Sequence, residues 1–207
     1  MNKINKSLAP NIRIYFDTVD TRLIYYIMEI LKNKNLRFTI LDKEGLKDID
    51  VTITDKEKYG KAVLQVKEIT YNPASDFVKI ASKMFGEKKD SLCIGIDPGK
   101  RTGIAAFFGT KLVLNEVISP WEDAVLYIVE VLKEIGFNRK LVKIGAGNLN
   151  AAEELKKVLQ LRFDNLEIYF VNEQRTTKTA KKKGNRGREK DKISAVEIAR
   201  KNGKRVV

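Results

Sequence analysis

The stretch LCIGIDPGKRTGIAAFF, residues 92–108, decides the fold of the second half of the chain. Its first apolar run, Leu92–Ile96, predicts a buried strand that ends on the carboxylate of Asp97. Pro98-Gly99 then predicts a turn into a second apolar run, Ile104–Phe108. The stretch therefore predicts a β-hairpin with one acid at its rim. An Asp in this position either forms the turn through its own hydrogen bonds or takes part in chemistry.

Three glycines, Gly95, Gly99 and Gly103, surround this acid in the sequence. Because glycine has no side chain, we expect them to leave room for a phosphate, or a metal-bound phosphate, to approach the backbone. The surroundings of Asp97 therefore favour a chemical role beyond that of a turn former.

The composition indicates an acidic partner. The 207 residues include 40 Lys and Arg against 27 Asp and Glu, a formal net charge of +13 at pH 7. Such an excess favours nucleic acid, or less often an anionic membrane or a ribosomal surface. The sequence has neither a long apolar run nor the apolar stretch of a signal peptide. We therefore expect a cytoplasmic protein without a membrane partner.

The chain has no histidine, and Cys93 is its only cysteine. The missing histidine excludes imidazole general acids and bases, Ser-His and Cys-His nucleophiles, and zinc sites that need imidazole. Cys93 lies inside the apolar strand, so we expect a small core residue. If the protein is an enzyme, carboxylates binding Mg²⁺ or Mn²⁺ are the simplest chemistry.

The apolar pattern predicts two α/β domains, residues 1–88 and 91–207, separated by a polar run. In the first domain we expect a βαβ unit with a parallel sheet, then two strands and a helix. The expected elements are Asn11–Phe16, Thr18–Lys32, Leu36–Leu41, Asp50–Thr54, Ala62–Val66 and Ala74–Phe85. This domain has no chemical motif, so we expect an accessory role.

The second domain is expected to follow the order βββαβαβα. After the hairpin, the expected elements are a strand at Lys111–Ile118, a helix over 119–135, a strand at Leu141–Ala146, a helix capped by Asn150, a strand at Leu166–Asn172 and a helix opening at Asp191. This order predicts a mixed five-stranded sheet with flanking helices. We expect the residues after the last helix to form a tail.

The string IGIDPGKRTGIA resembles the first motif of the RNase H-like superfamily, in the branch of the Holliday junction resolvase RuvC and the YqgF-type nucleases. The resemblance covers residues 91–207 and implies an RNase H-like domain in which Asp97 is the first metal ligand. The stretch VNEQRTT is similar to the Asp-Glu-Arg-Leu-Thr-Thr block of YqgF-type proteins, which implies Glu173 as a second ligand. Asp191 matches an acid at the start of the family's last helix and is implied as the third.

Three positions depart from the family pattern. RuvC has a Glu at the end of the fourth strand, where this chain has neutral residues up to Gly147 and Asn148. Asn172 replaces an Asp of the YqgF block, and Ser194 replaces the second Asp of the last helix.

Three functions stay open. The first is a two-metal-ion nuclease that cuts branched or structured nucleic acid, DNA by resemblance and RNA as an alternative, with Mg²⁺ or Mn²⁺ on Asp97, Glu173 and Asp191. The second is a domain of the same fold that binds nucleic acid without catalysis. The third is a small nucleotide-binding module, since actin-like ATPases and their heat-shock relatives share the first motif.

A basic tract lies between two of the expected ligands. Residues 175–190, RTTKTAKKKGNRGREK, contain eight basic residues and one acid. Each Lys or Arg that neutralises a phosphate releases a counterion, which predicts salt-dependent binding to nucleic acid. With two residues of the hairpin turn, the expected contacts are Lys100, Arg101, Arg175, Lys178, Lys181, Lys182, Lys183, Arg186, Arg188 and Lys190. RuvC-like resolvases act as dimers, so the resemblance also implies a homodimer.

Overall fold

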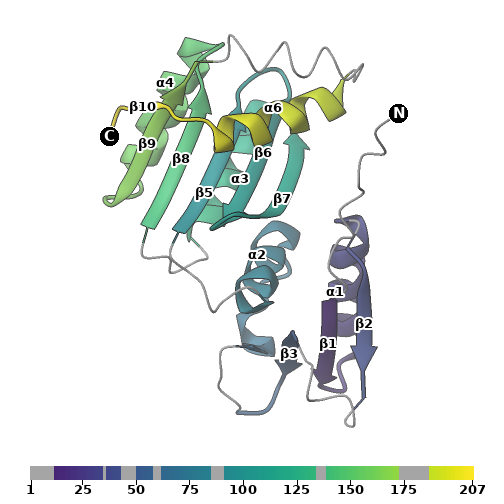
Figure 1. Cartoon of the computed structure of the whole chain (residues 1–207). Coiled ribbons are helices and arrows are strands. Elements are labelled where there is room, and N and C mark those ends of the chain that lie inside the picture. The colour runs from purple at the N-terminus through teal and green to yellow at the C-terminus, as the bar shows by residue number, and fades with distance from the viewer. Residues whose placement is uncertain are drawn as a thin grey trace. The chain divides into compact units, whose positions relative to one another are not determined.

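The computed structural model describes residues 12–34, 36–42, 50–57, 62–84, 91–133, 139–172 and 187–207. The chain divides into two compact units, Met1–Glu87 and Lys88–Val207. Each unit has its own sheet, and Figure 1 labels their elements.

The first unit is built on a parallel sheet with strand order β2-β1-β3-β4. Its described elements are β1 (Ile12–Asp17), α1 (Thr21–Asn33), β2 (Phe38–Leu41), β3 (Val51–Thr54), β4 (Val63–Gln65), the short 3₁₀ helix η2 (Val66–Glu68) and α2 (Pro73–Met84). The predicted βαβ unit and parallel sheet are confirmed. Parallel neighbours need a crossover connection, which α1 supplies between β1 and β2.

Helix α1 shows how this unit forms from its sequence. Apolar residues at helical spacing, among them Leu23, Ile27 and Ile30, are buried on one face. The helix begins at Thr21, later than the predicted Thr18, because the Asp20 side chain caps it by accepting from the Leu23 backbone N–H at 3.1 Å.

Asp76 is a fully buried carboxylate in the first turn of α2. It accepts hydrogen bonds from the Tyr26 hydroxyl at 2.8 Å and from the backbone N–H of Thr70 at 2.9 Å. A buried charge is costly unless it is hydrogen-bonded. Through these bonds Asp76, a residue of α2, connects this helix to α1 and to the loop that precedes α2.

The second unit contains a mixed sheet with strand order β10-β9-β8-β5-β6-β7. Its described elements are β5 (Ser91–Asp97), β6 (Thr102–Phe108), β7 (Lys111–Ile118), α3 (Trp121–Lys133), β8 (Arg139–Gly145), α4 (Leu149–Gln160), β9 (Leu166–Val171), α6 (Arg188–Arg200) and β10 (Lys204–Arg205). The strands β5, β6 and β7 form an antiparallel meander, whereas β5, β8 and β9 are parallel. The α/β class and the predicted hairpin are confirmed.

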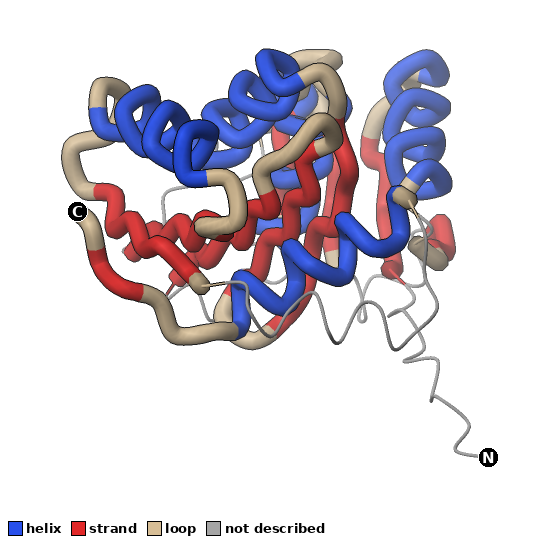
Figure 2. Tube along the Cα trace, turned by 90° about the horizontal axis from the view of Figure 1, so that it is seen from above, coloured by secondary structure: helices blue, strands red, loops and turns tan. Residues whose placement is uncertain are grey.

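Helices cover both faces of this sheet. Helices α3 and α4 lie on one face, and α6 crosses the other over β5 and β6 (Figures 1 and 2). Side chains alternate between the faces along each strand, so Ile94 and Ile96 are buried on the α3 and α4 side while Gly95 faces α6.

Three details of the second unit differ from prediction. The described sheet has six strands instead of five, because the expected tail forms β10, which pairs antiparallel with β9. Helix α4 is capped by Asn148, whose side chain accepts from the Ala151 N–H, and the predicted cap Asn150 lies inside the helix. Helix α6 begins at Arg188, so Asp191 lies within its first turn.

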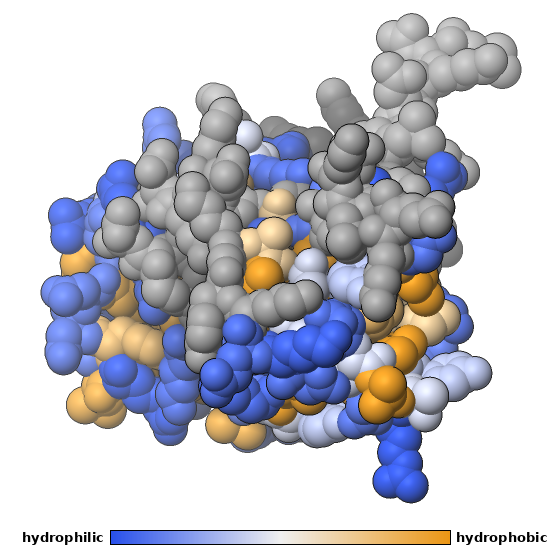
Figure 3. Space-filling view, turned by 90° about the horizontal axis from the view of Figure 1, so that it is seen from below, coloured by the Kyte–Doolittle hydropathy of each residue, from blue (hydrophilic) through white to orange (hydrophobic). Residues whose placement is uncertain are grey.

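Figure 3 shows one face of the molecule, on which hydrophilic residues dominate and hydrophobic residues are scattered among them. Within the described part of the chain, no helix has the length and apolar character needed to span a membrane.

Candidate metal and nucleic-acid site

Asp97 lies where three parallel strands end at one edge of the sheet. The neighbouring strands β5, β8 and β9 run parallel and end at Asp97, Gly145 and Val171. Asn172 follows directly after β9 at the same edge. In open α/β sheets, ligands commonly bind beyond the carboxyl ends of the strands. The sheet therefore places the predicted acid where ligand sites occur.

Helix α6 brings Asp191 next to Asp97. Gly103 on β6 is the residue directly opposite Asp97, and opposed residues have Cα atoms about 4.5–5.5 Å apart. A Cβ on Gly103 would collide with the carbonyl oxygen of Asp191 and lie 2.8 Å from its carbonyl carbon. The backbone of Asp191 thus rests on the residue beside Asp97. The two acidic residues come from elements far apart in sequence and lie on one face of the sheet.

Gly95 and Gly103 have a different role from the one predicted. We expected them to leave room for a phosphate, but α6 fills that space, and a Cβ on Gly95 would lie 2.6 Å from the Ala199 Cβ. These glycines allow the helix backbone to approach the sheet closely. Gly99 lies in the turn, where a Cβ would lie 3.3 Å from the backbone oxygen of Arg101.

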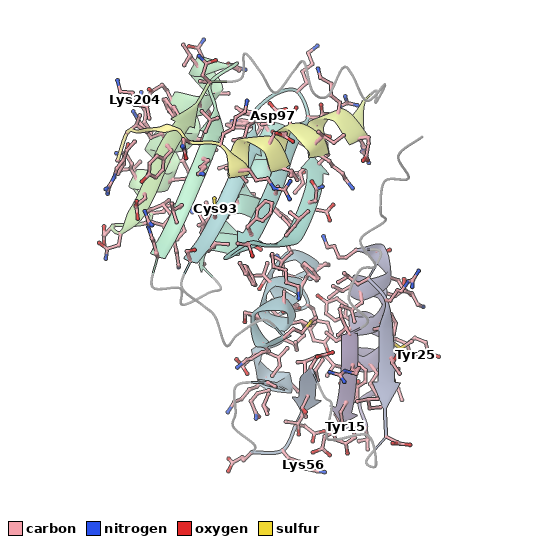
Figure 4. All side chains as sticks on the ribbon, viewed as in Figure 1. Tyr15, Tyr25, Lys56, Cys93, Asp97 and Lys204 are labelled. Carbon is pink, nitrogen blue, oxygen red and sulfur yellow. The ribbon has the colours of Figure 1, made fainter. Side chains whose placement is uncertain are left out.

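The strand pattern directs the Asp97 side chain to the α6 face. Cys93, Gly95 and Asp97 alternate along β5 and so share one face of the sheet. Cys93 Sγ donates to the backbone oxygen of Ala199 on α6 at 3.6 Å. In Figure 4, Cys93 and Asp97 both lie on the strand that α6 crosses, with Asp97 at its upper end. Asp97 therefore lies on the same side of the sheet as Asp191.

Arg101 forms an ion pair with Asp191. Its Nε lies 3.1 Å from Asp191 Oδ2. That oxygen is buried, yet it accepts no hydrogen bond from any residue that the structure describes. We conclude that Arg101 compensates the charge of Asp191 but donates no hydrogen bond to its Oδ2. Sequence reasoning assigned Arg101 to nucleic acid alone and missed this pair, because the partners are 90 positions apart in the chain.

Lys143 is a structural residue that sequence reasoning missed. Its Nζ donates to the backbone oxygens of Ala199 at 2.9 Å and Lys201 at 2.7 Å, and so satisfies carbonyls at the C-terminal end of α6. Lys143 on β8 pairs with Gly95 on β5, so both residues lie on the sheet face that α6 covers. This position in the strand is the one sequence signal that could have indicated a contact between Lys143 and α6. Nearby Cys93 is partly buried, and this burial raises the pKa of its thiol.

The remaining predicted residues divide into two groups. Lys100 and Arg188 are exposed, and Lys190 is half-buried. The predicted ligand Glu173 and the predicted contacts Arg175, Lys178, Lys181, Lys182, Lys183 and Arg186 lie outside the described residues. Ser194, where the family of the resemblance carries a second Asp, is a buried residue of α6 itself.

The orphaned Oδ2 of Asp191 fits a divalent cation. A buried oxygen without a donor is costly, and a hard cation is one partner that satisfies a carboxylate. In the described ranges, no group of three or more Asp, Glu, Cys or His side chains is placed to hold a metal ion. Asp97 and Asp191 are two carboxylates that could serve as ligands, fewer than the three side chains of such a group.

Comparisons with known protein families and with curated proteins find no match to this chain. We therefore infer its function from its residues, their geometry and the resemblance of its first motif.

Proposed function

We propose that the second unit is a metal-dependent phosphodiesterase that cuts branched or structured nucleic acid. The observation that carries the proposal is that Asp97 and the backbone of Asp191 lie on one face of the sheet, since Asp191 contacts Gly103, the residue opposite Asp97. Asp191 has a buried oxygen, Oδ2, that has no hydrogen-bond donor within the described ranges. Like charges held together in this way are costly unless a cation binds between them.

The strand order supports the proposal. The resemblance implies a first strand that neighbours the fourth strand and lies beside the last helix. In this unit β5 neighbours β8, and α6 packs on β5 and β6. The pairing of β5 with β8 and the packing of α6 on β5 support the proposal in this respect.

The chain's own residues would divide the work. Asp97 and Asp191 would hold Mg²⁺ or Mn²⁺, with Glu173 as the third ligand that the resemblance implies. When bound, such an ion polarises a phosphoryl oxygen and orients an attacking water. Lys100 and Arg188 present exposed cations in the same unit and would neutralise phosphates.

The direct test is cleavage of an end-labelled four-way DNA junction by the full chain, with a linear duplex of the same sequence for comparison. We expect cleavage of the junction in Mg²⁺ or Mn²⁺ and none in EDTA. Asp97→Asn should reduce the rate about 100-fold or more, because a bound metal supplies several kcal/mol of charge stabilisation. Binding of the junction should be retained, because the basic residues are unchanged.

Asp123→Asn is the matched control, since Asp123 is an exposed acid in the first turn of α3. It should cleave at the wild-type rate. A wild-type rate for Asp97→Asn would refute the proposed role of this carboxylate.

A second candidate is a nucleic-acid-binding protein without catalysis. It is favoured by the buried Ser194 and by the ion pair in which Arg101 already compensates Asp191. Tight junction binding in Mg²⁺ and Mn²⁺ with no nicking by the wild-type chain would support this candidate over the first.

A further inference from the structure

Arg101 connects the turn after Asp97 to the first turn of α6. Its side chain is 44% exposed, so the guanidinium reaches solvent while its Nε lies 3.1 Å from Asp191 Oδ2. A Cβ on Gly187, the residue before α6, would lie 3.5 Å from Arg101 Nη1. The guanidinium therefore rests against the start of α6 and faces both the carboxylate and solvent.

The contact between Arg101 and Asp191 is easily exchanged. Ion pairs with a solvent-exposed member contribute little to stability, and this one lacks good hydrogen-bond geometry at the buried oxygen. A guanidinium has five donors in a planar fork that matches phosphate oxygens in a bidentate manner. A phosphate at the hairpin turn would therefore compete well for Arg101.

We propose that Arg101 couples nucleic-acid binding to metal binding at this site. In the free protein Arg101 compensates Asp191 and opposes the binding of a second cation at Oδ2. A backbone phosphate draws Arg101 away, and Oδ2 then accepts a divalent ion. This inference rests on the proposed function. It implies that Asp191 Oδ2 becomes available to the metal ion only when the polyanion is bound.

Thermodynamic linkage makes the coupling reciprocal. If a phosphate partner raises the affinity for the metal, the metal raises the affinity for that partner by the same factor. Arg101 is the exposed member of the competing ion pair, and such pairs are weak. We therefore expect each ligand to raise the affinity for the other by a factor of about five. The effect is therefore measurable from either side.

The first measurement is Mn²⁺ binding to the full chain alone, read from the electron paramagnetic resonance signal of free Mn²⁺. Arg101→Gln should bind Mn²⁺ about fivefold more tightly than wild type. Arg162→Gln is the matched control, because it makes the same charge-removing substitution at an exposed arginine of the second unit that has no place in the proposed site. It should bind Mn²⁺ as wild type does. Thermal unfolding would check that all variants are folded.

The second measurement is the affinity for a fluorescent four-way DNA junction in EDTA and in Ca²⁺. Ca²⁺ should strengthen binding about fivefold for wild type and Arg162→Gln, and the strengthening should be lost in Arg101→Gln. If Mn²⁺ binds in a manner that requires Asp97 but Arg101→Gln behaves as Arg162→Gln does, this inference is overturned and the proposed function stands. If none of the variants binds Mn²⁺, both are overturned.

Discussion

Replacing Gly95 by Ala should displace α6 from the sheet. The new Cβ would lie 2.6 Å from the Ala199 Cβ, whereas non-bonded carbons prefer about 3.5–4.0 Å, so the helix must move by roughly 1 Å or more. Overpacking of this kind costs about 1–3 kcal/mol of unfolding free energy. A loss of 1–2 kcal/mol of unfolding free energy corresponds to about a 5- to 30-fold larger population of molecules in which this region is open. The movement should therefore expose Cys93, the only cysteine, whose Sγ contacts Ala199.

Two assays follow the displacement. Urea unfolding monitored by the single tryptophan, Trp121 in α3, reports the stability of the second unit, and the rate of thiol labelling of Cys93 reports access beneath α6. Gly109→Ala is the control: Gly109 has φ +57°, but an added Cβ would meet no described atom within 4 Å. This variant should lose about 1–2 kcal/mol of unfolding free energy, because alanine is strained in a left-handed backbone conformation. Labelling of Cys93 in the native state should stay slow. Equal labelling rates for Gly95→Ala and wild type would refute the close contact of α6 with β5.

Three further predictions concern single contacts. Lys143→Met should lower the unfolding free energy by about 1.5–3 kcal/mol and speed Cys93 labelling, because carbonyls at the end of α6 lose a charged donor; unchanged labelling would contradict this. Arg139 holds the pKa of Glu167 at about 2, so its stabilising effect should be present above pH 4.5 and disappear as pH falls towards 2. The urea midpoints of wild type and Glu167→Gln should therefore differ at pH 6 and converge in acid, and a constant difference would be the contrary result. Tyr26→Phe should cost about 1.5–3 kcal/mol, measured by urea unfolding followed by circular dichroism, because buried Asp76 loses a donor; a neutral effect would count against that network.

The elements with strong apolar patterns could be predicted from the sequence. The hairpin around Asp97 and the buried face of α1 both follow from periodicity, because burial of apolar residues determines their packing. β10 could not be predicted in this way. It consists of Lys204 and Arg205, both exposed, and it joins the sheet through backbone pairing that leaves no apolar signature.

The candidate site was predictable residue by residue but not as an arrangement. The resemblance pointed to Asp97 and Asp191 as single residues. The role of Gly103, in contrast, depends on which helix crosses β6 and which residue of that helix contacts the strand. The Arg101 ion pair and the Lys143 cap likewise depend on contacts between distant segments. Local pattern carries no information about such contacts, because they arise only when α6 packs on the sheet.

The central claim is that Asp97 and Asp191 hold one divalent cation together. Crystals of the full chain soaked in MnCl₂ would test it through the anomalous scattering of manganese. The account predicts an anomalous peak within about 2–2.6 Å of a carboxylate oxygen of each residue, the range in which hard cations bind oxygen. An anomalous map with no peak between these two carboxylates, or with manganese bound only at other acids, would contradict it.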